Sequence, residues 1–284
     1  MKTLILVRSG LVVLMLSFGT FVVLGQQQLL KRTTYKTDKF DFSAGGTIEI
    51  KGAPLGSIRV EARSKNEIEI SAEVEVQAVT ESDLAKLAEV TGYVVDESAS
   101  RVSITSIGLN DKKSLPKALR KLPKNLIGLP YKIDYVIKVP RYCDLQIDGG
   151  KGDLSVIGVE GAIHINYLST DAKISLVGGG LNGTFGTGTI DVTMPNRSWR
   201  GNAIDVALSS GTMSVHLPVN LSAELDATIV KTGSIENGLD GLRPRDRKVP
   251  LTDKLISANA GSGGVSMKFT VGNGTLRLIK LGKE

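Results

Sequence analysis

The sequence predicts an all-β protein: a single-stranded parallel β-solenoid, β-helix-like, behind an N-terminal β-rich portion that carries one short helix. Three observations predict this fold class. A glycine followed by alternating apolar and polar residues recurs along the chain, glycine supplies 32 of the 284 residues, and aromatic residues make up only 5%. The turns of a solenoid need glycine, and its narrow interior favours Ile, Leu and Val over aromatic rings.

The recurring phrase is Gly-x-Φ-x-Φ, where Φ is apolar and x is mostly polar. Its copies begin at Gly46, Gly56, Gly152, Gly161, Gly188, Gly211 and Gly274. Each copy is typical of a turn glycine followed by a strand of period two, with one dry and one wet face. Short strands of this kind bury the dry face only by stacking on their neighbours, which is the principle of a solenoid.

The chain opens with a segment that is typical of a secretory signal. Lys2 and Arg8 supply a basic region before an apolar stretch over 11–24, and Val23 and Gly25 at the −3 and −1 positions favour cleavage after Gly25. An uncleaved membrane anchor is the alternative, but the stretch is short for a span of about 20 residues. We therefore expect residues 1–25 to be removed and the protein to be exported, to the periplasm or the cell surface.

Charge and cysteine content narrow the function class. The formal net charge is +6, and it falls to +4 once the two basic residues of 1–25 are removed. On an exported chain this modest excess argues against nucleic acid as a partner and favours anionic glycans, phospholipid headgroups or a role in solubility. Cys143 is the single cysteine, so no intrachain disulfide can form. We expect it to be a small buried side chain rather than a nucleophile.

The β-rich portion is expected over residues 45–140, after a flexible lead-in over 26–44 that is extended or disordered. Its clearest strand runs over 67–76, with apolar residues on one face and Glu67, Glu69, Glu73 and Glu75 on the other. The acidic face is expected to be solvated surface; a metal-binding comb is the alternative, but no loop geometry supports it. A capping box over 80–83, followed by leucines at helical spacing, predicts the helix over 81–91.

A basic insertion over 111–130 interrupts the strand pattern. It carries Lys112, Lys113, Lys117, Arg120, Lys121 and Lys124, together with leucines at helical spacing. It is interpreted either as an amphipathic patch that contacts anionic membrane or polysaccharide, or as a leucine-faced insertion that covers the end or flank of the solenoid. Pro123 shortens any helix and favours the second interpretation.

Residues 141–284 are expected to form the solenoid. Apolar pairs recur there, and their first members, Leu154, Ile163, Ile174, Ile190, Ile204 and Met213, are 9, 11, 16, 14 and 9 residues apart. Steps of 9 to 11 indicate successive sides of one coil, so a coil takes about two such units and each strand is parallel to the one a coil below. Residues 238–253 are expected to be an exposed loop, and two last strands over 265–271 and 275–279 to close or cap the stack.

Several segments follow the pattern of one family. They are Lys138-Val-Pro140, the glycine units at Gly152 and Gly161, Ser210-Gly-Thr-Met-Ser-Val-His-Leu-Pro218 and Thr232-Gly-Ser-Ile235. In these segments the chain resembles the bacterial "putative adhesin" domain family, exported β-solenoid proteins of largely unknown function. The resemblance covers residues 45–280 and is clearest over 131–237, and the basic insertion departs from it. The motif is a fold signature, so the resemblance implies adhesion by analogy only.

Residues that could carry chemistry are few. His164 and His216 occupy outward positions without a metal-ligand spacing, and the motifs of zinc proteases, serine hydrolases and phosphate-binding loops are missing from the sequence. Four aspartates also occupy outward positions: Asp153, Asp171, Asp191 and Asp205. They would stack into a ladder in a carbohydrate-active β-helix enzyme, whereas the ordinary preference of Asp for turns and strand starts also explains them. Trp199 could stack on a sugar or pack over a loop.

We therefore expect a non-enzymatic scaffold or adhesin-like binding protein of the cell envelope or surface, without cofactor or metal. Its candidate binding surface comprises the six basic residues of the insertion and His164, Asp191, Trp199, Asp205 and His216. Expected partners are a cell-envelope component, an anionic glycan or a surface protein; peripheral membrane contact is a further option, and nucleic acid is not expected. A periplasmic envelope-stress or regulatory component is the first alternative, and a carbohydrate-active parallel β-helix enzyme is the second.

Overall fold

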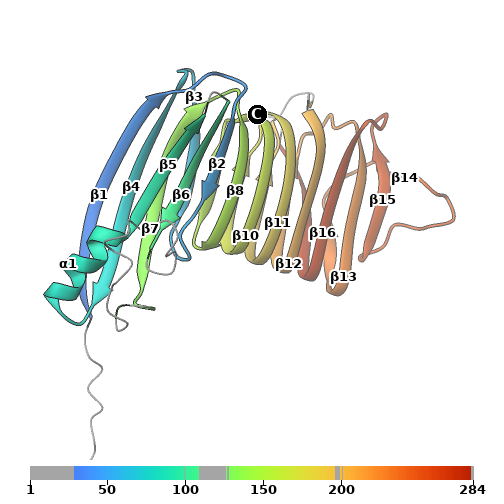
Figure 1. The fold of residues 1–284 in the computed structure, drawn as a ribbon. Helices are drawn as coiled ribbons and strands as arrows, with labels where there is room; N and C mark the ends of the chain where they lie inside the picture. The colour runs from blue at the N-terminus through green and yellow to red at the C-terminus, as the bar shows by residue number, and fades with distance from the viewer. Residues whose placement is uncertain are drawn as a thin grey trace, which may run out of the picture.

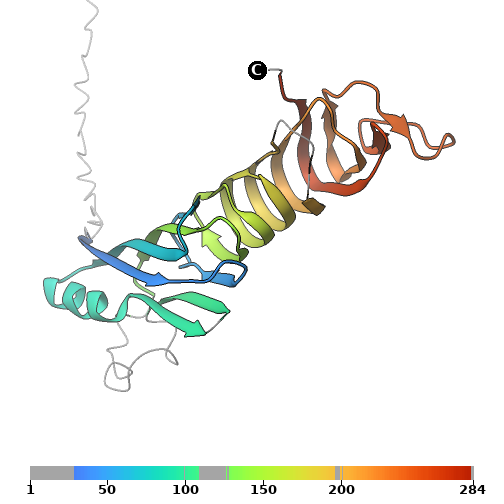
Figure 2. The ribbon, with the colours of Figure 1, turned by 90° about the horizontal axis from the view of Figure 1, so that it is seen from above.

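The computed structural model describes residues 29–98, 100–108, 126, 128–195, 199 and 201–282. These residues form an all-β structure with one helix, and the strands belong to one mixed sheet of 16 strands. Figures 1 and 2 show the strands stacked side by side into an elongated body, with the N-terminal strands at one end and the C-terminal strands at the other. Among the described residues, no helix is long and apolar enough to span a membrane.

The strands divide along the chain into three groups. The N-terminal strands are β1 (Leu30–Asp41), β2 (Thr47–Lys51), β3 (Ile58–Arg63), β4 (Glu67–Ala78), β5 (Gly92–Ser98), β6 (Arg101–Ile107) and β7 (Tyr131–Pro140). The central strands are β8 (Asp144–Lys151), β9 (Leu154–Ile157), β10 (Glu160–Ser175), β11 (Gly178–Thr193) and β12 (Gly201–Leu217). The C-terminal strands are β13 (Ala223–Asn237), β14 (Arg243–Pro244), β15 (Leu255–Ala260) and β16 (Val265–Lys280).

The sheet has two arms that share its long strands. The first half of β10 pairs with β8 and the second half with β9, and these continue separately to β2 and β3. Arm A contains β5, β6, β2, β8, the first halves of β10, β11, β12, β16 and β13, and then β15 and β14. Arm B contains β1, β4, β7, β3, β9 and the second halves of the same five long strands.

Each long strand turns a corner between the arms. In β10, Ile165 and Tyr167 are buried before the corner and Ala172 and Ile174 after it, so the alternation of buried and exposed residues changes phase. The apolar side chains of both arms meet in one core, which continues from the N-terminal strands to β16 and β13. The period-two pattern of the sequence thus supplies the two walls of this core.

A column of glycines forms the corner and explains the copies of the recurring phrase at Gly188, Gly211 and Gly274. On β11, β12, β16 and β13 the column consists of Gly188, Gly211, Gly274 and Gly233, with φ between +120° and +140°. A β carbon on Gly211 would lie 1.9 Å from the carbonyl oxygen of Gly188. Only glycine combines this backbone angle with so close an approach of the neighbouring strand. On β10 the column continues as Thr170, which is buried and whose hydroxyl has no partner among the described residues.

The central strands pair in parallel with a regular step. Ile163 of β10 lies beside Leu145 of β8 and Leu181 of β11, at the same distance along the sequence in each direction. The next step, from Leu181 to Ile204 of β12, is longer. These steps agree with the expectation of about two short units between paired strands, and the expected parallel pairing is confirmed. The sheet is not closed, however, because its paths end at β1, β5 and β14, so the single-stranded solenoid stays a prediction.

The structure bears on two expectations about the ends. The lead-in over 26–44 is expected to be extended or disordered, and β1 within it is extended and pairs antiparallel with β4 along all twelve of its residues. The strands expected to cap the stack form one strand, β16, which lies inside the sheet between β12 and β13. The end of arm A is formed instead by β15 and β14, which pair antiparallel. Pairing between distant segments leaves no local pattern, so neither arrangement follows from the sequence.

The predicted helix forms as α1 (Glu81–Val90). The hydroxyl of Thr80 accepts a hydrogen bond from the backbone N–H of Asp83, which is the contact that the capping box predicts. The apolar face of α1 forms a second, smaller core with Val76, Ala78 and Leu126. The signal-like segment 1–25 lies outside the described residues, and so does most of the basic insertion.

Candidate binding surface

The outer face of arm A carries a continuous row of polar side chains. In register across seven strands, this polar row comprises Glu49, Gln146, His164, Asn182, Asp205, Lys268 and Asp226. Pairing in register places neighbouring members about one strand spacing, roughly 4.8 Å, apart. Their chain neighbours, such as Ile163, Leu181 and Ile204, are buried, so alternation turns the row toward solvent.

A hollow of about 210 Å³ opens beside the middle of the polar row. His164, Asn182 and Asp205 line it, and Ala162 and Gly180 lie two positions before the first two of these, on the same face. The hollow forms there because Ala162 and Gly180 have little or no side chain. An imidazole, an amide and a carboxylate together offer hydrogen-bond donors and acceptors, which suits a polar, uncharged ligand surface.

Trp199 lies next to this hollow but packs on the protein. Its indole N–H donates to the carbonyl oxygen of Asn202 at 3.2 Å, and Asn202 lines the hollow. The ring lies so close to Gly201 that a β carbon there would stand 2.3 Å from it, and it is half-buried against the main core. The structure thus favours the loop-packing interpretation of Trp199.

The charges of the polar row are locally balanced. The Nζ of Lys268 lies 3.6 Å from a carboxylate oxygen of Asp205, and both side chains are about half exposed. An exposed pair of this kind contributes only about 0–1 kcal/mol. The pair can therefore open at little cost and free Asp205 for a ligand in the hollow.

Asp191 and His216 form a separate pair on arm B. The Nε2 of His216 lies 3.4 Å from a carboxylate oxygen of Asp191. Asp191 is in register with Lys173 and Ser214, whereas Asp205 is on the other arm. The ladder of four aspartates is therefore not formed.

Other carboxylates have structural partners. The carboxylate of Asp171 accepts a hydrogen bond from the backbone N–H of Thr189 at 3.0 Å. On β4, ion pairs replace the acidic comb: Glu67 pairs with Lys39, Glu69 with Lys138 and Glu75 with Lys31. No group of three or more metal-ligating side chains comes together in the described part of the chain.

The six basic residues of the candidate surface all lie outside the described residues: Lys112, Lys113, Lys117, Arg120, Lys121 and Lys124. Of the five remaining candidates, His164 and Asp205 share the hollow, Trp199 borders it, and Asp191 and His216 lie on the other arm.

Sequence reasoning missed five members of the polar row: Glu49, Gln146, Asn182, Lys268 and Asp226. Gln146, His164 and Asn182 are evenly spaced along the sequence, and this even spacing is the one signal that would have aligned them. Lys268 lies far beyond Asp205 in the chain, so only the register of β16 brings it there.

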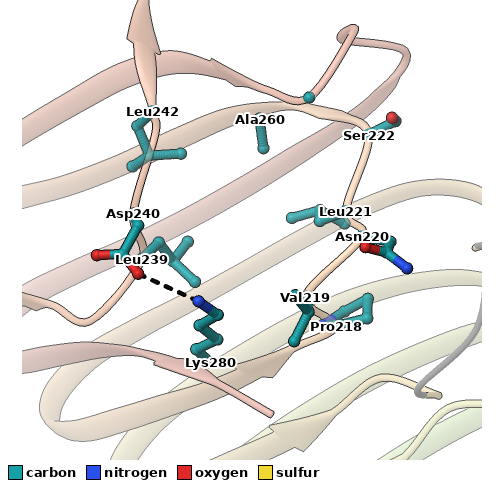
Figure 3. Close-up of a pocket in the computed structure, with 11 residues that line it drawn as sticks. Pro218, Val219, Asn220, Leu221, Ser222, Leu239, Asp240, Leu242, Ala260 and Lys280 are labelled. Atoms are coloured by element: carbon teal, nitrogen blue, oxygen red, sulfur yellow. Dashed lines mark hydrogen bonds and ion pairs between the residues drawn. The ribbon is translucent and has the colours of Figure 1, made fainter. Parts of the chain in front are cut away.

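A larger pocket, about 380 Å³, lies at the C-terminal end of the body (Figure 3). Leu221, Leu239 and Leu242 contribute apolar side chains to its lining, and the ion pair of Lys280 with Asp240, 3.1 Å long, lies at one side of it. Its lining comes from four separate segments, so no sequence pattern predicts it.

No protein-family model matches the sequence, and no curated protein matches it either. Among solved structures, it is similar to a "putative cell adhesion protein" from Clostridium sporogenes, with 9% identity and a TM-score of 0.47 over 88% of this chain and 100% of that one. A "putative adhesin" from Bacteroides fragilis has 11% identity and a TM-score of 0.29 over 87% and 97% of the two chains. A "putative lipid binding protein" from Parabacteroides distasonis has 12% identity and a TM-score of 0.31 over 86% and 96%. At these TM-scores the likenesses carry no argument about function, which must come from the side chains of this chain.

Proposed function

We propose that this chain is a non-enzymatic, exported binding protein of the cell envelope or surface, adhesin-like in its role. Its sheet serves as a rigid scaffold, and the outer face of arm A holds the partner. The observation that carries the proposal is the hollow beside the polar row, where His164, Asn182 and Asp205 stand in register on three adjacent strands. A side-chain array on paired strands is held in place before a ligand arrives, which lowers the entropic cost of binding.

We further propose cleavage after Gly25, a β-rich portion over 45–140 and a solenoid over 141–284. The sequence and the regular step between paired strands support these three features. The equal steps from β8 to β10 and from β10 to β11 support the solenoid. The signal-like residues of 1–25 support export.

A polyhydroxylated polymer such as an envelope glycan is the partner that suits the hollow. Its hydroxyls donate and accept hydrogen bonds, as do the imidazole, amide and carboxylate that line the hollow. The basic insertion would add attraction for an anionic glycan or a membrane surface, and a surface protein is a further candidate. The carboxylates of Glu49, Asp205 and Asp226 in the same row argue against nucleic acid.

The arrangement of carboxylates favours binding over glycan cleavage. Glycoside hydrolases place two carboxyl groups on either side of the scissile bond. Among the described residues that line the hollow, Asp205 is the one carboxylate, and Asp191 lies on the other arm. The enzyme therefore stays an alternative without a specific observation in its favour.

The test is co-sedimentation with isolated envelope and with peptidoglycan, at low and high salt. The protein is purified after export, so that its N-terminal segment is in its natural state. We expect saturable retention that is reduced in His164→Ala and Asp205→Asn. His216→Ala is the matched control, because it removes the other imidazole from the opposite arm.

Other results of this experiment would favour a different binding site or a different function. Unchanged retention of both variants would exclude the hollow as the binding site, and salt-sensitive retention lost on neutralising the six basic residues would move the site to the insertion. No retention of the unmodified protein would contradict the binding proposal and favour the envelope-stress or regulatory component. Release of reducing ends would favour the enzyme.

A further inference from the structure

Strand β1 is an open edge of the sheet. It pairs with β4 from Leu30 to Asp41, and no other described strand pairs with it. Figure 1 shows it as the outermost strand at the N-terminal end. An edge of twelve residues presents a long row of unpaired backbone N–H and C=O groups, which is a template for pairing with another chain.

Short length, proline and bulges, three of the usual protections of an edge strand, are missing from β1. Its register with β4 is unbroken, and it contains neither proline nor glycine. The terminal strand of arm A, β14, is by contrast only two residues long and includes Pro244. Short length, proline and bulges are the devices that keep natural edges apart.

Lysine on an edge strand also protects it, but the lysines of β1 are engaged within their own chain. Lys31 pairs with Glu75 at 2.5 Å and Lys39 with Glu67 at 2.8 Å. The Nζ of Lys36 lies 3.2 Å from a carboxylate oxygen of Asp38 and 4.1 Å from the centre of the Tyr93 ring. Their charges are therefore compensated before another strand approaches.

We propose that a second copy of this chain pairs with β1, antiparallel, about a two-fold axis at Tyr35. Tyr35 is the most exposed large apolar side chain of the described residues, at 77% of its surface. A two-fold axis at this point lets each copy complete the edge of the other. The two sheets then continue into one another.

The sequence of β1 is largely self-complementary in this register. With Tyr35 opposite Tyr35, Arg32 lies opposite Asp38 and Leu30 opposite Phe40, and symmetry repeats both pairs. Lys31 lies opposite Lys39, and the carboxylates of Glu75 and Glu67 compensate these two charges within each chain. Opposite charges and apolar pairs directly across two strands stabilise their pairing. A slip by one residue would set the core face of one copy against the outer face of the other.

Both members of the charged pair can reach a second copy. The side chains of Arg32 and Asp38 are 36% and 38% exposed. Within its own chain Arg32 pairs with Glu81, whose side chain is 68% exposed. Asp38 pairs there with Lys36 and accepts a hydrogen bond from Tyr93 through one of its two carboxylate oxygens. An exposed pair contributes only about 0–1 kcal/mol, so Arg32 can exchange it for Asp38 of the second copy at little cost.

A charge swap tests the register. Arg32→Asp and Asp38→Arg each replace two attractive contacts by two repulsive ones, and we expect the dissociation constant of the dimer to rise about tenfold or more in either variant. An equimolar mixture of the two variants restores opposite charges at both contacts and is expected to recover the dimer as a heterodimer. Analytical ultracentrifugation over a concentration series measures the masses.

Asp38→Arg also removes a hydrogen bond from Tyr93, so it can affect the folding of the monomer as well as the dimer. A second variant tests the dimer without this side effect. Tyr35→Lys places like charges at the two-fold axis and leaves that bond intact, and it should weaken the dimer by a similar factor. Tyr142→Lys, at an exposed tyrosine outside β1, is the control. A monomer throughout the series, a dimer unaffected by Tyr35→Lys, or a mixture no better than its components would overturn the proposal.

Discussion

The hydroxyl of Tyr93 donates a hydrogen bond to the carboxylate of Asp38, with the two oxygens 2.7 Å apart. Tyr93 lies on β5, the edge strand of arm A at the N-terminal end, and Asp38 lies on β1, the edge strand of arm B at the same end. The ring of Tyr93 also packs edge to face on Tyr135 of β7, with 5.7 Å between ring centres. The arms diverge from β10, and this contact joins them again at the N-terminal end of the core.

Removing the hydroxyl should weaken this end of the core. For Tyr93→Phe we expect the free energy of unfolding to fall by about 1 kcal/mol, which is below the range for a charged acceptor because Asp38 is more than a third exposed. Denaturant unfolding measures the change. Tyr142→Phe, at an exposed ring, should leave the midpoint unchanged, and equal shifts in the two variants would contradict the role of the bond.

Acid should destabilise the fold through the carboxylates of β4. Hydrogen bonds from Lys39, Lys138 and Lys31 hold the pKa of Glu67, Glu69 and Glu75, respectively, below the ordinary value of 4.5. Near pH 4.5 and below it, the unfolded chain therefore binds more protons than the folded one. The stabilisation from these carboxylates is complete at pH values above 4.5, and it is lost as the pH falls through their lower pKa values in the folded state. The thermal midpoint should therefore drop between neutral pH and pH about 3.

The matched variant for the acid effect is Lys138→Met, which removes the hydrogen bond from Lys138 to Glu69. Its thermal midpoint should depend less on pH over the same range, since the pKa of Glu69 then returns toward its ordinary value. A pH profile identical to that of the unmodified protein would show that this ion pair contributes nothing.

The glycine column should be intolerant of any side chain. Gly211→Ala combines a φ of +140° with a β carbon 1.9 Å from the carbonyl oxygen of Gly188. We expect a loss of at least about 2 kcal/mol in the free energy of unfolding, or failure to fold. Gly92→Ala is the control, because no atom lies within 4 Å of its added β carbon and its φ is ordinary. Similar losses in both variants would contradict the special requirement for glycine at the corner.

Cys143 should be chemically inert in the folded protein. It is 2% exposed, its thiol donates to the carbonyl oxygen of Pro140 at 3.1 Å, and burial raises the pKa of the thiol to about 12. Since the thiolate is the reactive form, alkylation by iodoacetamide should proceed only on unfolding. Mass spectrometry with and without denaturant measures this, and equal rates would contradict the burial.

Local patterns in the sequence predicted the elements that they govern directly. The alternation over 67–76 lies within β4 because a strand with one buried face repeats every two residues. The capping box placed the start of α1 correctly because its hydrogen bonds are local. His164 and Asp205 could be chosen because histidine is rare in this chain and outward carboxylates stand out.

Register and long-range pairing could not be predicted in the same way. The antiparallel pairing of β1 with β4 and the insertion of β16 between β12 and β13 join segments far apart in the chain. Turns of unequal length hide the alignment of Asn182 with Asp205, since the step from β11 to β12 is longer than the step from β10 to β11. The sequence therefore predicted only His164 and Asp205 of the polar row, and the register of the strands is needed to identify the other members.

The equal steps on both sides of β10 have a consequence for the length of the molecule. Residues 160–177 amount to one interchangeable unit, because a chain lacking them would set β11 directly on β8 and β9 with buried positions still over buried positions. Each such unit gained or lost changes the length of the body by about 4.8 Å and leaves both ends as they are. The length of the body and the structure of its two ends are therefore separable properties of this protein. One can vary in evolution or design while the other is kept.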